Sequence, residues 1–168
     1  KICIVYSHHK LGDLIWQLPY IKSISDYHSC KITLVTRPKT QAKDILKDEV
    51  YVEKIHYNLF RKKICFILDL VSLLFFFKKE KFTHIYLLDK ISRPAIAARL
   101  AGVKNIIGVG IGNQSKWITN KKYLSNEDFR FNFSQQTQKF LEMQGIETKI
   151  KTPKINFSKE SLKSIKIE

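Results

Sequence analysis

The chain has 168 residues, 44% of them hydrophobic, which is enough to bury the core of one ordinary domain and argues against global disorder. Its 30 basic residues exceed the 15 acidic ones and give a net charge of +15, but the lysines that dominate are spread along the chain rather than interleaved with aromatic residues. That pattern argues against nucleic acid as a partner and favours a solvated basic surface. Cys3, Cys30 and Cys65 lack C-x-x-C spacing, so they indicate buried thiols in a reducing compartment, not a disulfide scaffold or a zinc site.

Apolar, β-branched segments alternate with segments of helical periodicity along the chain. The first kind predicts strands at residues 2–6, 31–36, 51–57, 82–88 and 105–109. The second kind predicts helices at residues 13–26, 59–77, 92–101 and 134–144, with a short one ending at residue 46. Such a series of β-α units predicts one α/β domain over residues 1–150, a Rossmann-like doubly wound parallel sheet. Residues 151–168 are polar and lysine-rich and are interpreted as a linker.

Two segments need a separate prediction. Pro19 lies inside the first helical segment and is expected to kink the helix or to start a second short one. Residues 64–77 are the most apolar window, yet they fall short of the roughly 20 residues that cross a bilayer. Basic runs at 61–63 and 78–79 flank this window. A core helix with cationic ends is the favoured interpretation, and an amphipathic helix in a membrane interface is the alternative.

The turn between the first strand and the first helix is the candidate site, because ligands of α/β sheets collect beyond the carboxyl ends of the strands. Gly12 lies in this turn, and Asp13 is the carboxylate expected at the first position of the helix. Asp13 either caps the helix, worth ~1 kcal/mol, or acts as a base. His8 and His9 are rival bases with an intrinsic pKa of about 6.5. Adjacent residues at a strand end point to opposite sides, so the two histidines make a poor metal pair.

Other residues at the strand ends each have a functional and a plain interpretation. Lys10 either holds an acceptor phosphate or carboxylate, or is solvated. Arg93, near a helix start, either adds to anion binding or forms a surface salt bridge. Trp117 either stacks on a sugar or pins its loop. The glycines of residues 108–112 look like half a dinucleotide fingerprint, but no helix and no ribose-binding acid follow them, so NAD is a weak prediction.

The order and spacing of several motifs resemble the N-terminal half of glycosyltransferase family 9, the heptosyltransferases that extend the lipopolysaccharide inner core. The family has L-G-D and L-P after its first strand, then an Asp, a basic position and an R-L-A-G helix end. The matching positions here are Leu11-Gly12-Asp13, Leu18-Pro19, Asp89, Arg93, Arg99-Leu100-Ala101-Gly102, Ile107-Gly108, Gly145-Ile146 and Pro153. The similarity covers residues 2–155.

This resemblance implies a cytoplasmic glycosyltransferase of the GT-B fold, with this chain as the acceptor-binding half. The linker would lead to a donor-binding domain that the given sequence lacks. The implied reaction is an inverting, metal- and cofactor-independent transfer from a nucleotide sugar, expected to be ADP-heptose, to a lipopolysaccharide core glycolipid. Asp13 matches the family's base, and Lys10, Gly12 and Arg93 are the residues expected to bind the acceptor. A peripheral contact with the cytoplasmic face of the inner membrane is also expected.

A second function class stays open at this point. The chain would then be a stand-alone Rossmann-like module that binds a nucleotide or an anionic glycan without catalysis. Binding of a core glycan without nucleotide would favour the transferase, and tight nucleotide binding by this chain alone would favour the module.

Overall fold

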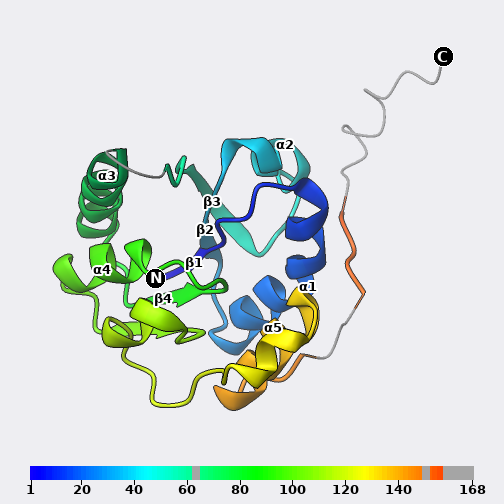
Figure 1. Cartoon of the computed structure of the whole chain (residues 1–168). Helices are drawn as coiled ribbons and strands as arrows, with labels where there is room; N and C mark the ends of the chain where they lie inside the picture. Colours follow the sequence, from blue (N-terminus) through cyan, green and yellow to red (C-terminus); the bar gives the residue numbers. More distant parts are fainter. Residues whose placement is uncertain (62–64, 149–151, 157–168) are drawn as a thin grey trace.

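The computed structural model describes residues 1–61, 65–148 and 152–156, and its centre is an all-parallel sheet (Figure 1). The strands are β1 (Ile2–Val5), β2 (Ile32–Thr36), β3 (Val52–Tyr57), β4 (His84–Leu87) and β5 (Asn105–Gly108). Their order in the five-stranded sheet is β3-β2-β1-β4-β5. The helices are α1 (Leu11–Tyr27), α2 (Ala42–Ile45), α3 (Cys65–Glu80), α4 (Arg93–Leu100) and α5 (Phe133–Met143). The predicted α/β class and doubly wound parallel sheet are confirmed.

The strand order reverses its direction of growth between β1 and β4, at the middle of the sheet. In open α/β sheets such a switch point opens a crevice beyond the strand ends, because the loops after the two strands turn to opposite sides. The loop from β1 into α1 and the loop from β4 into α4 meet here. The topology therefore places the sequence-predicted turn and Asp89 at one edge.

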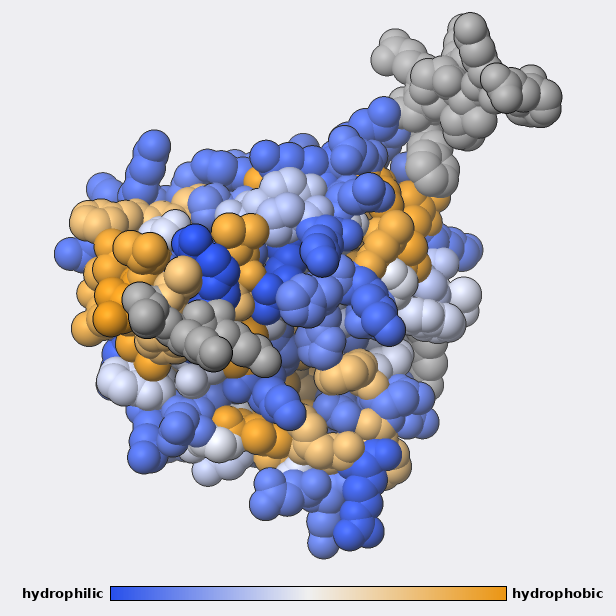
Figure 2. All heavy atoms as spheres, turned by 45° about the horizontal axis from the view of Figure 1, so that its top comes forward, coloured by the Kyte–Doolittle hydropathy of each residue, from blue (hydrophilic) through white to orange (hydrophobic). Residues whose placement is uncertain are grey.

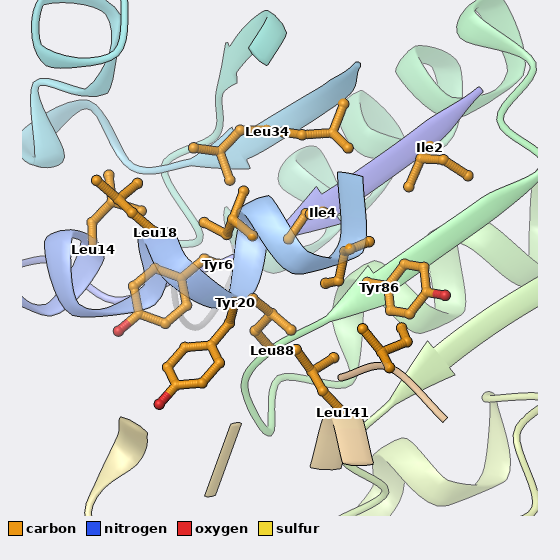
Figure 3. Packing of buried hydrophobic residues seen from close by; sticks show 14 of the residues in the cluster. Ile2, Ile4, Tyr6, Leu14, Leu18, Tyr20, Leu34, Tyr86, Leu88 and Leu141 are labelled. Atoms are coloured by element: carbon orange, nitrogen blue, oxygen red, sulfur yellow. The ribbon is translucent and has the colours of Figure 1, made fainter. Parts of the chain in front are cut away.

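Side chains of β1 alternate between two cores, one on each face of the sheet. Ile2 and Ile4 face the core under α1 and α5, while Cys3 and Val5 face the core under α3 and α4. Figure 1 shows these helix pairs on opposite sides of the sheet, and Figure 3 shows the first core from close by. All strand residues of β1 and β2 are buried, as expected for a parallel sheet covered on both faces.

Helix α1 runs without interruption through Pro19, so the predicted second helix does not form. The helix also begins two residues earlier than predicted, with Lys10 as its N-cap and Asp13 in its first turn. Proline removes one backbone hydrogen bond, but Leu14, Leu18 and their neighbours on α1 are buried against the sheet. Tertiary packing of this face outweighs the local cost, as it does for most helices in proteins.

Helix α3 begins at Cys65, later than the predicted residue 59, and residues 62–64 lie outside the described part of the chain. Before it, Asn58 Oδ1 accepts a hydrogen bond from the Phe60 amide at 2.9 Å, and Phe60 has a φ of 47°. This local turn competes with helix formation, which explains the late start. Within the described residues, no helix has both the length and the apolar character needed to cross a membrane.

The ends of the later elements agree closely with their sequence signals. Gly102 and Gly145 follow α4 and α5 with φ values of 78° and 77°, the left-handed conformation of a helix C-terminus. Asn132 and Gln135 form a capping box at the start of α5. Further on, Asn156 donates its backbone and side-chain N–H groups to the buried Glu49 carboxylate at 2.7 and 3.0 Å. Part of the predicted linker therefore lies against the domain.

Candidate functional site

Asp13 lines a hollow of about 380 Å³ at the carboxyl edge of the sheet. Its side chain is 39% exposed, and its one ionic contact among the described residues is His8 Nδ1, at 3.8 Å from Oδ2. That separation is too long for a hydrogen bond. Because Lys10 is the N-cap, the interpretation of Asp13 as a plain cap is wrong. The first turn of a helix nevertheless favours a negative charge, through the backbone dipoles.

His8 and Tyr6 lie beside Asp13. The two rings stack at 5.1 Å between centroids, and His8 meets the edge of Phe133 at 4.4 Å. The Tyr6 hydroxyl donates to the Asp13 backbone oxygen at 3.3 Å. Burial, and then the charges of Asp13 and Asp89, raises the pKa of the Tyr6 phenol far above its ordinary value. Tyr6 is therefore a neutral donor, and the rival base His8 lies in the same site as Asp13.

A second hollow, of about 560 Å³, adjoins the first along the same edge. Asn132 and Phe133, at the start of α5, line both hollows. The second hollow continues past His8 to Asp89 and Lys90 after β4. The site is thus an open cleft between the first turn of α1 and the loop that leads into α5.

Three residues that the sequence analysis missed complete the wall around Asp13. Gln17, one helical turn after Asp13, is 1% exposed, and its Oε1 has no hydrogen-bond partner among the described residues. Trp16 and Phe133 line the same hollow and are half exposed. A glutamine on the core-facing stripe between Leu14 and Leu18 was the available signal, since buried polar side chains normally have a partner.

Asp89 lines the second hollow, but its carboxylate is bound by backbone amides. Its carboxylate accepts hydrogen bonds from the Ser7 amide at 2.6 Å and the Ile91 amide at 3.0 Å. The Gln114 side chain donates to the Asp89 and Ile91 carbonyl oxygens, at 2.8 and 2.9 Å. These bonds join the ends of β1 and β4 and so set the position of His8.

The space beside Gly108 and Gly110, at the end of β5, is filled by other side chains of the protein. A Cβ on Gly110 would lie 2.4 Å from Tyr123, and Gly110 has a φ of 82°. A Cβ on Gly108 would lie 2.8 Å from Ile118. Close packing of the following loop therefore explains Gly108 and Gly110 and leaves no space beside them for a pyrophosphate, whereas a Cβ on Gly112 would meet no atom within 4 Å. Trp117 packs against the α3/α4 core, which agrees with the interpretation that it pins this loop.

Lys10 and Gly12 lie close to Asp13 in the chain, at the start of α1, but they line neither hollow, and Arg93 lies elsewhere. Lys10 and Gly12 are exposed, and a Cβ on Gly12 would meet no atom within 4 Å. Arg93 is buried and donates to Asp69 of α3 at 2.9 Å and to the Arg61 carbonyl oxygen. It lines neither hollow of the cleft. The geometry therefore does not support the expected acceptor contact of Arg93. Arg93 does form a salt bridge, as the alternative interpretation expects, but that salt bridge is buried instead of lying on the surface.

Within residues 1–61, 65–148 and 152–156, no group of three or more His, Cys, Asp or Glu side chains is placed to hold a metal ion. His28 and His84 lie near each other, with ring centroids 4.8 Å apart, and His28 Nε2 is 2.8 Å from the Tyr86 hydroxyl. Burial lowers the pKa of both histidines. This cluster lies at the amino end of the sheet and has no part in the cleft.

Comparison with known proteins gives matches by structure only. No family model matches the sequence, and no curated protein matches it. The glycosyltransferase of family 9 from Veillonella parvula has a TM-score of 0.76 and 17% identity, over 95% of this chain and 45% of that one. E. coli ADP-heptose lipopolysaccharide heptosyltransferase II has a TM-score of 0.66 and 12% identity, over 95% and 47%.

A third match widens the comparison. E. coli heptosyltransferase WaaC with ADP-2-deoxy-2-fluoro heptose has a TM-score of 0.64 and 12% identity, over 88% of this chain and 49% of that one. The chain thus spans about half the length of the solved structures it matches. These comparisons show that the chain has the fold of family 9 glycosyltransferases over about half of their length, as the motif order indicates.

Proposed function

We propose that this chain is the acceptor-binding half of a glycosyltransferase and that Asp13 is its base. The observation that carries the proposal is the partly exposed Asp13 carboxylate at an open cleft, with no hydrogen-bonding partner among the described residues. The likeness of fold to heptosyltransferases supports the same reaction class. Asp89 at the same edge already accepts hydrogen bonds from the Ser7 and Ile91 amides, whereas Asp13 is left open to a ligand.

The surroundings of Asp13 suit a sugar hydroxyl. Aromatic faces such as those of Trp16 and Phe133 pack on the apolar faces of sugar rings, and the Gln17 amide offers hydrogen bonds beside them. Asp13 would accept the proton of the acceptor hydroxyl as its oxygen bonds to the anomeric carbon and the nucleoside diphosphate departs. A positioned base typically contributes about 10²–10⁴-fold to such a step. The His8 ring lies close enough to Asp13 to stabilise the negative charge of its carboxylate.

Lys10 and Gly12 are proposed to contact the acceptor beside the cleft. Lys10 supplies a positive charge for a phosphate or carboxylate of a core glycan, and Gly12 leaves the backbone open to its approach. For the donor, the ADP-heptose and ADP named with the E. coli structures support a nucleotide sugar with adenosine diphosphate as its leaving group. ADP-heptose and a lipopolysaccharide core acceptor at the cytoplasmic face of the inner membrane are the specific proposal.

Two titrations of the purified chain test the acceptor role. A core glycan with acidic sugars should bind with this chain alone, while ADP-sugar should not bind tightly. Tight nucleotide binding without glycan binding would contradict the proposal and favour a nucleotide-binding module.

The base is tested by Asp13→Asn in a protein that carries both halves of the transferase. The expected result is a loss of turnover of about 10²–10⁴-fold with little change in acceptor affinity, because the amide cannot take the proton. Asp44→Asn is the matched control, since Asp44 is an exposed carboxylate in the first turn of α2, away from the cleft. Near-normal turnover in Asp13→Asn would remove this residue from the mechanism.

A further inference from the structure

The outward face of α3 is an apolar stripe on the surface. Ile67 and Phe75 are each 65% exposed, Leu68 is 60% exposed and Val71 39%. At their spacing of one, three and four residues these side chains lie along one side of the helix. Figure 2 shows hydrophobic surface gathered over α3, at the left of the view. No described residue covers this outward face.

The stripe is not a loosely packed part of the core. On its other side α3 buries Leu73, Phe76 and Phe77 against the sheet and α4. Asp69 in its second turn is held by Arg61 and Arg93. The helix is therefore fixed in orientation by its inward face, and the outward residues are surplus to the fold. Contiguous exposed apolar surface of this kind marks an interaction site.

Positive charge surrounds the stripe. Lys78 and Lys79 are exposed at the C-terminal end of the same face, and the Arg61 side chain is 44% exposed beyond its N-terminal end. The whole chain carries +15. Two copies of such a chain repel each other, whereas anionic lipid headgroups attract it. An apolar stripe with cationic ends on a surface helix is the pattern of a segment that lies in the headgroup region of a bilayer.

We propose that the outward face of α3 docks the protein on an anionic lipid bilayer, with Ile67, Leu68, Val71 and Phe75 in the interface and Lys78 and Lys79 at the headgroups. Only the purpose of this docking rests on the proposed function: a docked protein would hold its cleft near a membrane-anchored acceptor. Helix α3 follows β3 and α1 follows β1, so both helices begin at the carboxyl edge of the parallel sheet. The N-terminal end of the docked helix therefore lies at the same edge of the sheet as the Asp13 cleft, on the opposite face of the sheet.

Vesicle sedimentation with the 168-residue chain tests the docking. Vesicles of equal parts phosphatidylcholine and phosphatidylglycerol should bind the chain, and vesicles of phosphatidylcholine alone should bind it at least about tenfold more weakly. Ile67→Ser with Phe75→Ser should weaken binding to the anionic vesicles by about tenfold or more. The matched control is Tyr27→Ser with Val50→Ser, which removes two exposed apolar side chains elsewhere and should leave binding unchanged.

Three results would overturn the proposal: equal binding to both kinds of vesicle, unchanged binding of the α3 variant, or a concentration-dependent dimer that the α3 variant abolishes while vesicles stay unbound. The vesicles contain no glycolipid, so this outcome is separate from the acceptor role. Glycan binding in solution should be the same in the α3 variant and the parent chain. Lysines 78 and 79 are tested by Lys78→Glu with Lys79→Glu, which should lower binding to anionic vesicles and reduce its dependence on salt.

Discussion

Asp13 and Asp69 lie on opposite sides of the sheet, each on a helix that starts at its carboxyl edge, and their surroundings differ sharply. Both oxygens of Asp69 accept hydrogen bonds from arginines, at 2.8 Å from Arg61 Nη2 and 2.9 Å from Arg93 Nη1. Asp13 has His8 at 3.8 Å and an open hollow in front of it. One carboxylate is already saturated by the protein, while the other is left for a ligand.

This difference separates a carboxylate that the protein uses for its own packing from one that is open to a ligand. A buried charge must be paired, so Asp69 and Arg93 keep each other in place between α3 and α4. Ligands bind where a protein leaves polar groups unpaired, and within the described part of the chain the Asp13 carboxylate has only His8 nearby, at 3.8 Å, and the Oε1 of Gln17 has no partner. The α3/α4 side of the molecule is therefore expected to respond in stability, and the α1/α5 side in binding and turnover.

Replacement of Asp69 should give the largest effect on stability. Asp69→Asn leaves the buried Arg93 without its counter-ion and should lower the free energy of unfolding by about 3–5 kcal/mol. Asp13→Asn, the matched change in the cleft, should shift it by less than about 0.5 kcal/mol. Urea unfolding followed by circular dichroism measures both. Equal losses in the two variants would end the distinction between the two carboxylates.

Asp128 affects both stability and binding, because its carboxylate holds the loop that forms one side of the cleft. The Lys139 ammonium and then the Ser125 amide hold the pKa of Asp128 below its ordinary 3.8. A carboxyl group with a lowered folded pKa stabilises the fold above its unfolded pKa, and this contribution is lost as pH falls through the folded value. Asp128→Asn should therefore cost about 1.5–3 kcal/mol at neutral pH.

The pH dependence supplies the check on Asp128. The difference in unfolding free energy between the parent chain and Asp128→Asn should narrow as the pH falls below 3.8. Unfolding curves for both proteins at neutral and acid pH measure it. A difference that stays constant down to the acid limit would mean that the charge of Asp128 does not hold this loop.

Gln17 should show a small effect on stability and a clear one on binding. Gln17→Leu removes an unpartnered buried oxygen, so the free energy of unfolding should change by less than about 1 kcal/mol. Core-glycan affinity should fall about tenfold, the loss of one hydrogen bond of ~1.4 kcal/mol. Gln138→Leu on α5, away from the cleft, is the control for both measurements. Unchanged glycan affinity in Gln17→Leu would remove Gln17 from the acceptor site.

Much of the fold was predictable because its signals are local. The five strands agree with the predicted segments to within two residues at each end. Short apolar runs rich in β-branched residues that alternate with helical segments seldom form anything but buried strands. Gly102 and Gly145 end their helices because glycine adopts the left-handed backbone conformation easily, whatever residues surround it. A second short helix at Pro19, one of the two predicted outcomes, does not form, because packing against the sheet keeps α1 continuous. Helix α3 starts later than predicted, because a side-chain turn at Asn58 overrides helical periodicity.

The cleft was predictable in part. The position of Asp13 at the carboxyl edge follows from the strand, glycine and helix order alone. Arg93 was misplaced because its partner, Asp69, is 24 residues away in the chain and reaches it only through the packing of α3 on α4. Trp16 and Phe133 were missed for the same reason, since they come from helices far apart in sequence that converge on one hollow.

By itself the sequence determined the α/β class, the parallel order of units and the edge at which chemistry is to be sought, because these depend on residue periodicity and on the handedness of strands and helices. Only the tertiary structure decided which charged groups are free. Burial and pairing are set by contacts between distant segments, and those contacts leave Asp13 open to the cleft, tie Arg93 to Asp69 and turn the apolar stripe of α3 outward.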